Sequence, residues 1–282
     1  MNFQNIFNLS ISTLLALFLV RVFNDNQILV LLIVLGQGHF IMSYFYTNKA
    51  GKMNSEFRKK FLILISILSI ICFYIYQNKQ YLDVLAFFTG VLFILHYYND
   101  EIKIQSIKRH RFFLLGSLAS MLAFAGVYAN KLFYIYNPSL YILSLLSFVI
   151  FFYFSYLVMK NKEDLGNNNV LYLIFFTFLN CYVPTILISN SAVSVYQIFG
   201  FIIFFHYFRW YIYYANIFND NKQSLYFYFK TIFNVHFLLT ALSFQYSLTR
   251  YGSFLVFIFN PIFFYGWTIM HILLSIRKTD YQ

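Results

Sequence analysis

The sequence predicts an all-α protein, a polytopic integral membrane helical bundle of about ten transmembrane helices in a single transmembrane domain, residues 1–282. Three observations predict this fold class. Hydrophobic residues make up 61% of the chain and charged residues only 10%, which is less charge than soluble domains carry. Long apolar runs recur from one end of the chain to the other, and most charged residues lie between them. We therefore expect the bilayer to be the solvent of this chain.

Each apolar run is long enough to cross the hydrocarbon core as a helix, with some tilt. The ninth run is the weakest, because polar residues such as Asn234 and His236 interrupt it. Proline could break a helix at Pro184 and at Asn260-Pro261, as in transporters, although prolines also kink ordinary spans. The runs lie at about 6–23, 28–47, 61–77, 81–98, 112–130, 138–160, 170–189, 195–215, 231–249 and 253–276.

Basic residues gather in the loops that follow every second run, and the positive-inside rule places such loops in the cytoplasm. We therefore expect both termini to be cytoplasmic, in a multi-pass protein of a bacterial cytoplasmic membrane. The net charge of +11 is explained by this topology, so no nucleic-acid partner is expected. The basic loops hold Lys49, Lys52, Arg58, Lys59, Lys60, Lys103, Lys108, Arg109, Arg111, Lys160, Lys162, Lys222, Lys230, Arg277 and Lys278, and the opposite side holds only Arg21, Lys79, Lys131 and Arg250.

Histidines share one predicted layer of the membrane. His39, His96, His206 and His271 fall in the second, fourth, eighth and tenth runs, which all cross in the same direction. Each lies past the midpoint of its run, toward the cytoplasmic end. His236 enters the ninth run from the cytoplasmic side and reaches a similar depth. Independent placement would scatter these residues over the whole thickness, so we expect several of them to meet.

A metal site is the chemistry that this layer favours. Polar groups in lipid are costly and usually face a cavity, a partner or a metal, and imidazole commonly binds zinc, copper and iron. Facing helices of a bundle can assemble such a site in their core. The alternative is that each histidine forms a hydrogen bond to a neighbouring helix. Outside this layer, His110 is predicted to lie in a loop.

The residues around two of these histidines suggest further roles. In "LGQGHF", Gly36 and Gly38 allow another helix or a ligand to approach His39 closely, or serve ordinary small-residue helix packing. In "HYFRW", Arg209 is interpreted as an anchor that reaches the cytoplasmic headgroups. Cys72 and Cys181 fall inside apolar runs, and we expect them to be small core residues.

Acidic residues follow His96 in "HYYNDE", with Asp100 one helical turn further on and Glu101 just off that face. A carboxylate here could ligate a metal or hold the second ring nitrogen of a ligating histidine. It could equally be an interfacial charge near Lys103. Other chemistries fit less well, because the sequence has no HxxxH pair, Walker loop, GxSxG elbow or CxxC motif.

These motifs resemble the Brp/Blh-type β-carotene 15,15'-dioxygenases, membrane proteins that cleave β-carotene to retinal with histidine-bound iron. The similar stretches are "LGQGHF", "HYYNDE", "FFHYFRW" and "WTIMHILLSI", and the separations between their histidines are also similar. The resemblance covers most of the chain through short motifs. It implies Fe(II) as cofactor, O₂ as co-substrate, a carotenoid as substrate, and His39, His96 and His206 as ligands. Zinc or copper stays open as the metal.

The chain departs from the family pattern at three positions. The family has a further ligand histidine one turn after the third, and here that position is Trp210. Gly38 replaces a proline, and Ser43 replaces an acidic residue. Either three histidines hold the metal, or the scaffold has lost this chemistry, or a further ligand completes the sphere from among His271, His236, Asp100 and Glu101.

Three functions follow from this reading. The leading one is an integral membrane non-haem iron oxygenase that takes a long apolar substrate from the bilayer and cleaves it with O₂. The second is an enzyme on the same scaffold that acts on another lipid with a different metal. The third is a non-enzymatic carrier, lipid-binding or assembly protein whose histidines form packing contacts. Metal content separates the third from the other two, and product analysis with β-carotene separates the first from the second.

Overall fold

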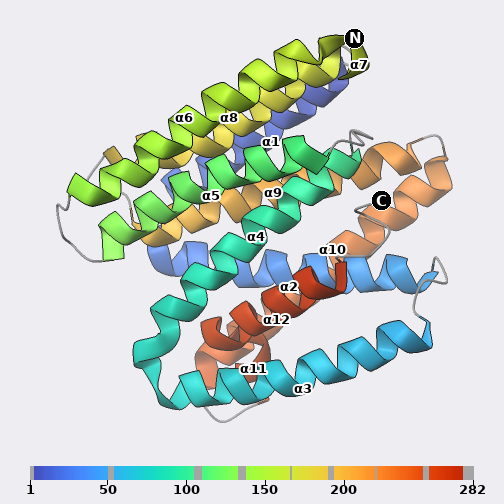
Figure 1. The fold of residues 1–282 in the computed structure, drawn as a ribbon. Helices are drawn as coiled ribbons and strands as arrows, with labels where there is room; N and C mark the ends of the chain where they lie inside the picture. The colour runs from blue at the N-terminus through green and yellow to red at the C-terminus, as the bar shows by residue number, and fades with distance from the viewer. Residues whose placement is uncertain are drawn as a thin grey trace. The chain divides into compact units, whose positions relative to one another are not determined.

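The structure, a computed structural model, describes residues 3–49, 54–104, 110–132, 138–165, 167–189, 194–219, 221–249 and 254–275 (Figure 1). Within these ranges the regular elements are all helices, so the predicted all-α class is confirmed. The elements are α1 (Phe3–Val22), α2 (Asp25–Lys49), α3 (Ser55–Gln77), the 3₁₀ turn η1 (Lys79–Tyr81), α4 (Leu82–Ile104), α5 (His110–Leu132), α6 (Pro138–Lys160), α7 (Lys162–Leu165), α8 (Asn167–Ser189), α9 (Val195–Phe218), α10 (Lys222–Thr249), α11 (Val256–Phe259) and α12 (Pro261–Ser275).

Each of the first nine predicted apolar runs lies largely within one helix, and several of these helices extend beyond the run, whereas the tenth run is divided between α11 and α12. The helix α10 begins at Lys222 rather than near residue 231, and α3 begins at Ser55 rather than near residue 61. Both starts are capped by an asparagine. The Asn54 Oδ1 accepts a hydrogen bond from a backbone N–H in the first turn of α3, and Asn221 Oδ1 accepts two in α10. Such caps satisfy N–H groups that have no partner inside the helix, so polar residues outside the apolar run can still be helical.

Among the described residues, five helical segments are long and apolar enough to cross a membrane: Asp25–Tyr46, Ser55–Gln77, Lys79–Glu101, Ile142–Lys160 and Lys222–Thr249. Shorter apolar helices occur at Ile6–Val22, Leu114–Gly126, Asn169–Cys181 and Pro261–Ser275. The number of ten spans and the cytoplasmic position of both termini stay predictions. Of the basic residues used for that orientation, Lys52, Lys108, Arg109, Arg250, Arg277 and Lys278 lie outside the described residues.

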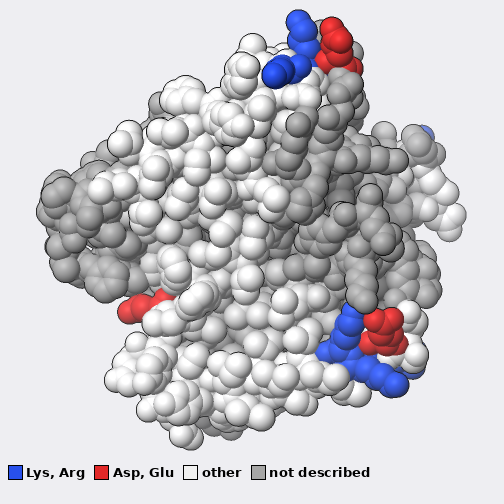
Figure 2. All heavy atoms as spheres, viewed as in Figure 1, with Lys and Arg blue, Asp and Glu red and all other residues white. Residues whose placement is uncertain are grey.

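Large apolar side chains are exposed on several of these helices. The exposed fraction is 70% for Ile70 on α3, 65% for Leu145 on α6 and 70% for Leu248 on α10. Charged residues form only small groups on the face drawn in Figure 2, and uncharged residues cover most of the rest of its described surface. A soluble monomer rarely exposes apolar surface this extensively, so the surface is compatible with a lipid environment.

The chain divides into two compact units, and the first comprises Met1–Asp25 and Gly90–Arg209. Within it, α5 packs against α6 and α8, α6 packs against α8, and α8 also contacts α1. Small residues allow this close packing, because Ala119 and Ala123 meet Phe151 and Cys181 in one buried cluster. The Ser147 hydroxyl of α6 donates a hydrogen bond to the Ala119 carbonyl of α5 at 2.8 Å. Hydroxyls that bond across helices in this way stabilise helix association in lipid.

A capping box starts α9, the helix that carries His206. The Ser194 Oγ accepts from the Gln197 N–H at 3.1 Å, and the Gln197 side chain accepts from the Ser194 N–H at 2.9 Å. The Ser194 hydroxyl also donates to Asp25 Oδ1 at 2.5 Å. The Gln197 amide donates to the Val20 carbonyl near the end of α1. These bonds fix where α9 begins and tie it to α1 within the first unit.

The second unit comprises Asn26–Thr89 and Trp210–Gln282, and its helix α12 packs against α3. The predicted break at Asn260-Pro261 is confirmed, because α11 ends at Phe259 and α12 begins at Pro261. The Asn260 side chain accepts a hydrogen bond from the Ile262 N–H at 3.0 Å, and proline suits the first helical position because it has no N–H to satisfy. The helix α8 continues through Pro184 without a break. The unit boundaries fall inside α4 and α9, which are both continuous helices.

Both cysteines are core residues, as predicted. Cys72 and Cys181 are both buried. Cys181 belongs to the α5–α6–α8 cluster of the first unit. Cys72 belongs to a cluster with Ile75, Leu85, Ile262 and Phe263 in the second unit. Each therefore serves as a small apolar residue at a helix contact.

Candidate metal centre

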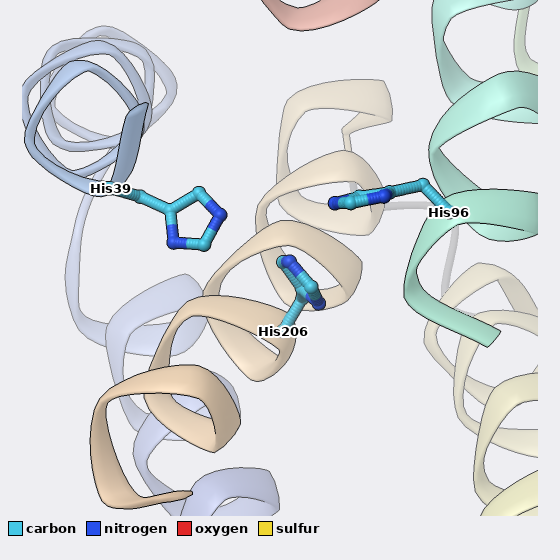
Figure 3. Close-up of side chains that lie close together, drawn as sticks. All are labelled: His39, His96 and His206. Atoms are coloured by element: carbon cyan, nitrogen blue, oxygen red, sulfur yellow. The ribbon is translucent and has the colours of Figure 1, made fainter. Parts of the chain in front are cut away.

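Two predicted ligands, His96 and His206, meet in the first unit. His96 lies on α4 and His206 on α9, and only 2% and 3% of their surfaces are exposed. Their ring centroids are 5.2 Å apart with an interplanar angle of 63°. Figure 3 shows the two imidazoles extending from their helices toward each other. The sequence prediction that histidines from separate apolar runs meet in space is confirmed for this pair.

Aromatic side chains surround the His96–His206 pair. The Phe93 ring lies 6.2 Å from the His96 ring and 5.2 Å from the His206 ring. The Tyr97 ring lies 6.3 Å from that of His206, and all four residues are buried. An aromatic wall keeps water away and lowers the local dielectric, which strengthens any charge interaction at the imidazoles.

A carboxylate lies beside the pair. The Asp100 Oδ2 is 3.4 Å from His96 Nε2, one helical turn along α4. This distance exceeds that of an ordinary hydrogen bond, so the contact is electrostatic. Two of the roles predicted for Asp100 are therefore compatible with its position: it lies close enough to orient His96 or to share a metal ion with it. A carboxylate in either role supports a histidine ligand.

Glu101 points to a different partner. Arg209 Nε donates to Glu101 Oε1 at 3.0 Å, and Arg209 Nη2 donates to Glu101 Oε2 at 3.0 Å. Tyr172 on α8 completes this network. Its hydroxyl donates to Glu101 Oε2 and accepts from Arg209 Nη2. Glu101 would have to give up these bonds to ligate a metal.

The interpretation of Arg209 as a headgroup anchor is wrong. Its side chain is buried in a bidentate ion pair rather than extended to the membrane surface. The physical reason is the nearby Glu101, because a paired and hydrogen-bonded guanidinium can stay in an apolar interior. Tyr172 is a further residue that the sequence prediction missed. The signal that could have found the ion pair is the opposite charges at the ends of two runs that are predicted to cross in the same direction.

His39 and His271 form a second buried histidine pair, within the second unit. The ring centroids are 5.0 Å apart, His39 on α2 and His271 on α12. Phe40 stacks on His271 at 4.7 Å. Trp210 contacts the His39 ring at 4.6 Å and an interplanar angle of 79°. Trp210, which stands where the resembled family has a further ligand histidine, therefore packs against His39, the first predicted ligand.

His236 uses both ring nitrogens within the second unit. Its Nδ1 lies 2.8 Å from the Ile232 carbonyl, which makes Nδ1 the donor. The Nε2 then accepts from the Tyr211 hydroxyl at 3.0 Å. The imidazole also packs directly on Gly38, because a Cβ at that position would lie 2.4 Å from His236 Nε2. Gly38 therefore serves close helix packing, one of the two roles predicted for it, and His236 would lose the Tyr211 bond on binding a metal.

The donor set fits a transition-metal ion. His39, His96 and His206 are all buried, and each offers a ring nitrogen that could ligate a metal. Imidazoles that bind one ion at about 2.1 Å have ring centres about 5 Å apart, which matches the His96–His206 spacing of 5.2 Å. The α5 helix begins at His110, so the predicted loop residue is at a helix start, and its side chain lies outside the described residues.

Comparison of the chain with protein-family models, with curated proteins and with solved structures gives no match in any of the three. The resemblance to the Brp/Blh-type dioxygenases therefore rests on the short histidine motifs alone. What the geometry adds is independent of that resemblance: a buried imidazole pair in an aromatic environment, with a carboxylate beside it.

Proposed function

We propose that the protein is an integral membrane iron protein that cleaves a long apolar alkene with O₂, with His96 and His206 as metal ligands. The observation that carries the proposal is the buried pair of imidazoles, from α4 and α9, with ring centroids 5.2 Å apart. Two nitrogen ligands and a nearby carboxylate suit iron, and the same donor types also accept zinc or copper. Open coordination positions are what an O₂-using site needs.

His39 is proposed as the third ligand because the sequence places it at the same predicted depth as His96 and His206. Like them it is buried, and it offers a ring nitrogen that could ligate a metal.

The chemistry of cleavage would divide between the metal and the chain. When bound, Fe(II) would supply the redox chemistry that lets O₂ react with an electron-rich alkene. Cleavage of one C=C bond by one O₂ gives two carbonyl products, each with one of the oxygen atoms. The chain's residues would bind the ion, hold it in place and exclude water. Phe93 and Tyr97 form the apolar side of the site, which suits a substrate drawn from the bilayer.

A second candidate is cleavage or oxidation of another lipid on the same scaffold. The observation that favours it is the indole of Trp210, which packs on His39 where the resembled family has a further imidazole. A bulky ring beside His39 changes the shape available to a substrate. A metal is expected in both candidates, a different one in the second, and product analysis with β-carotene separates them.

The experiment is an assay of the purified protein, loaded anaerobically with Fe(II), mixed with β-carotene in detergent and exposed to air. Retinal, detected by chromatography and mass spectrometry, is the expected product, and the His206→Ala variant should give none. O₂ consumption without retinal from a panel of other unsaturated lipids would support the second candidate. No turnover with any substrate by an iron-loaded protein would contradict the enzymatic proposal.

A further inference from the structure

A buried polar network lies one helical turn from the proposed ligands. Arg209 follows His206 by three residues on α9, and Glu101 follows His96 by five residues on α4. The guanidinium and the carboxylate meet through two hydrogen bonds of 3.0 Å each. The ion pair therefore joins the same two helices that carry the His96–His206 pair.

The geometry of this ion pair resists sliding of one helix along the other. A bidentate arginine–carboxylate pair fixes both distance and orientation, because two parallel N–H···O bonds must form together. A shift of one residue along a helix is about 1.5 Å, and the two 3.0 Å bonds would have to lengthen or the arginine side chain would have to change rotamer to follow it. A bidentate pair thus favours the present register of α4 against α9 over its neighbours.

Tyr172 links a third helix to the ion pair. Its hydroxyl, from α8, donates to Glu101 Oε2 and accepts from Arg209 Nη2 at 2.9 Å. All three side chains are buried, and charges buried in a membrane protein are costly unless they are paired. Since an apolar contact would hold the helices without that cost, a role in specifying geometry explains why the charges are there.

We propose that Glu101, Arg209 and Tyr172 are positioning residues that set the register of α4 against α9 and thereby hold His96 and His206 at ligand spacing. This inference rests on the proposed metal site. Metal coordination tolerates errors of only about 0.2 Å in ligand distance, so a loosened register lowers metal affinity even in a folded protein. None of the three residues needs to contact the ion or the substrate for this effect.

The test is titration of the full-length protein in detergent with Co(II), a spectroscopic substitute for Fe(II), read from its visible absorption bands. Glu101→Gln should raise the Co(II) Kd about 10-fold or more, as expected for residues that support metal ligands, and shift the bands. Tyr172→Phe keeps the ion pair and should raise the Kd less, with a smaller band shift. Exchange of the charges, Glu101→Arg with Arg209→Glu, should recover part of the lost affinity.

Tyr98→Phe is the matched control. Its hydroxyl also forms a buried hydrogen bond between α4 and α8, to Thr177 Oγ1 at 2.5 Å, but it takes no part in the ion pair. We expect it to keep the wild-type Kd and bands. Glu101→Gln leaves Arg209 buried without its counter-charge. If that variant does not fold, the comparison of Tyr172→Phe with Tyr98→Phe decides the result.

The outcomes separate the two proposals. If the wild-type protein binds no Co(II), the metal site is refuted and this inference falls with it. If the wild type binds, but folded Tyr172→Phe and Glu101→Gln keep its Kd and spectrum, the positioning role is overturned while the metal site stands. Equal weakening by Tyr98→Phe and Tyr172→Phe would also overturn it, since any lost contact would then suffice.

Discussion

Replacement of Gly38 by alanine tests the closest helix contact in the second unit. The added Cβ would lie 2.4 Å from His236 Nε2, 2.7 Å from Cε1 and 3.0 Å from Cδ2. The imidazole cannot simply rotate away, because Nδ1 is bonded to the Ile232 carbonyl at 2.8 Å and Nε2 to the Tyr211 hydroxyl at 3.0 Å. Relief of the clash therefore requires α2 and α10 to separate or the Tyr211 bond to break.

The size of the effect follows from these two costs. Overpacking of a well-packed contact costs about 1–3 kcal/mol, and loss of one buried hydrogen bond costs about 1 kcal/mol. Since either one relieves the clash, we expect Gly38→Ala to lower the free energy of unfolding by about 1–3 kcal/mol. The loss should show as a lower SDS midpoint in mixed detergent micelles, followed by circular dichroism.

The His236→Ala background supplies the control, because it removes the ring that the new Cβ would meet. There Gly38→Ala should cost less than about 0.5 kcal/mol, so most of the loss of about 1–3 kcal/mol should appear as a coupling energy between the two positions. Equal stability of Gly38→Ala and wild type would refute the contact. The same loss in both backgrounds would mean that Gly38 matters for another reason.

Three further substitutions test other parts of the structure. Ser194→Ala removes the capping box of α9 and should lower the free energy of unfolding by about 1–2 kcal/mol. Ser194→Thr should keep most of the wild-type stability. Equal stability of the wild type and both variants would contradict the cap. Gly266→Ala places a Cβ 2.6 Å from Cys72 Sγ and should lower stability by about 1–3 kcal/mol, a loss that Cys72→Ala should largely remove. Trp210→His restores the histidine of the resembled family and should raise metal affinity and β-carotene cleavage; an affinity unchanged from wild type would count against that resemblance.

The helices could be predicted because lipid leaves little choice. A chain that crosses the bilayer must satisfy its backbone internally over about twenty apolar residues, and the apolar runs are helical, the last of them divided into α11 and α12. The helix ends could not be predicted as well. The starts of α3 and α10 are set by the caps at Asn54 and Asn221, which lie outside the apolar runs.

The meeting of histidines was predicted, but not the way in which they pair. The run boundaries give the depth of His96, His206 and His271, yet they leave the rotation of each helix about its axis undetermined. That rotation puts His96 against His206 and turns His271 toward His39. Tertiary packing decides it, and packing depends on residues far apart in the sequence.

Arg209 shows the same limit for charges. Its position near the end of an apolar run is typical of an anchor that reaches the headgroups. The partner that holds it inside, Glu101, is on α4, more than one hundred residues earlier in the chain. Local sequence context cannot reveal such a pair, whereas comparison of charges at the same end of different runs could.

Elemental analysis of the detergent-purified protein tests the central claim most directly. Three samples are needed: the wild type, His206→Ala, and His236→Ala as a second histidine in an apolar helix whose nitrogens are both hydrogen-bonded. We expect about one iron per chain in the wild type and in His236→Ala, and loss of the metal in His206→Ala. No stoichiometric metal in the wild type, or equal metal in all three samples, would contradict the proposed site.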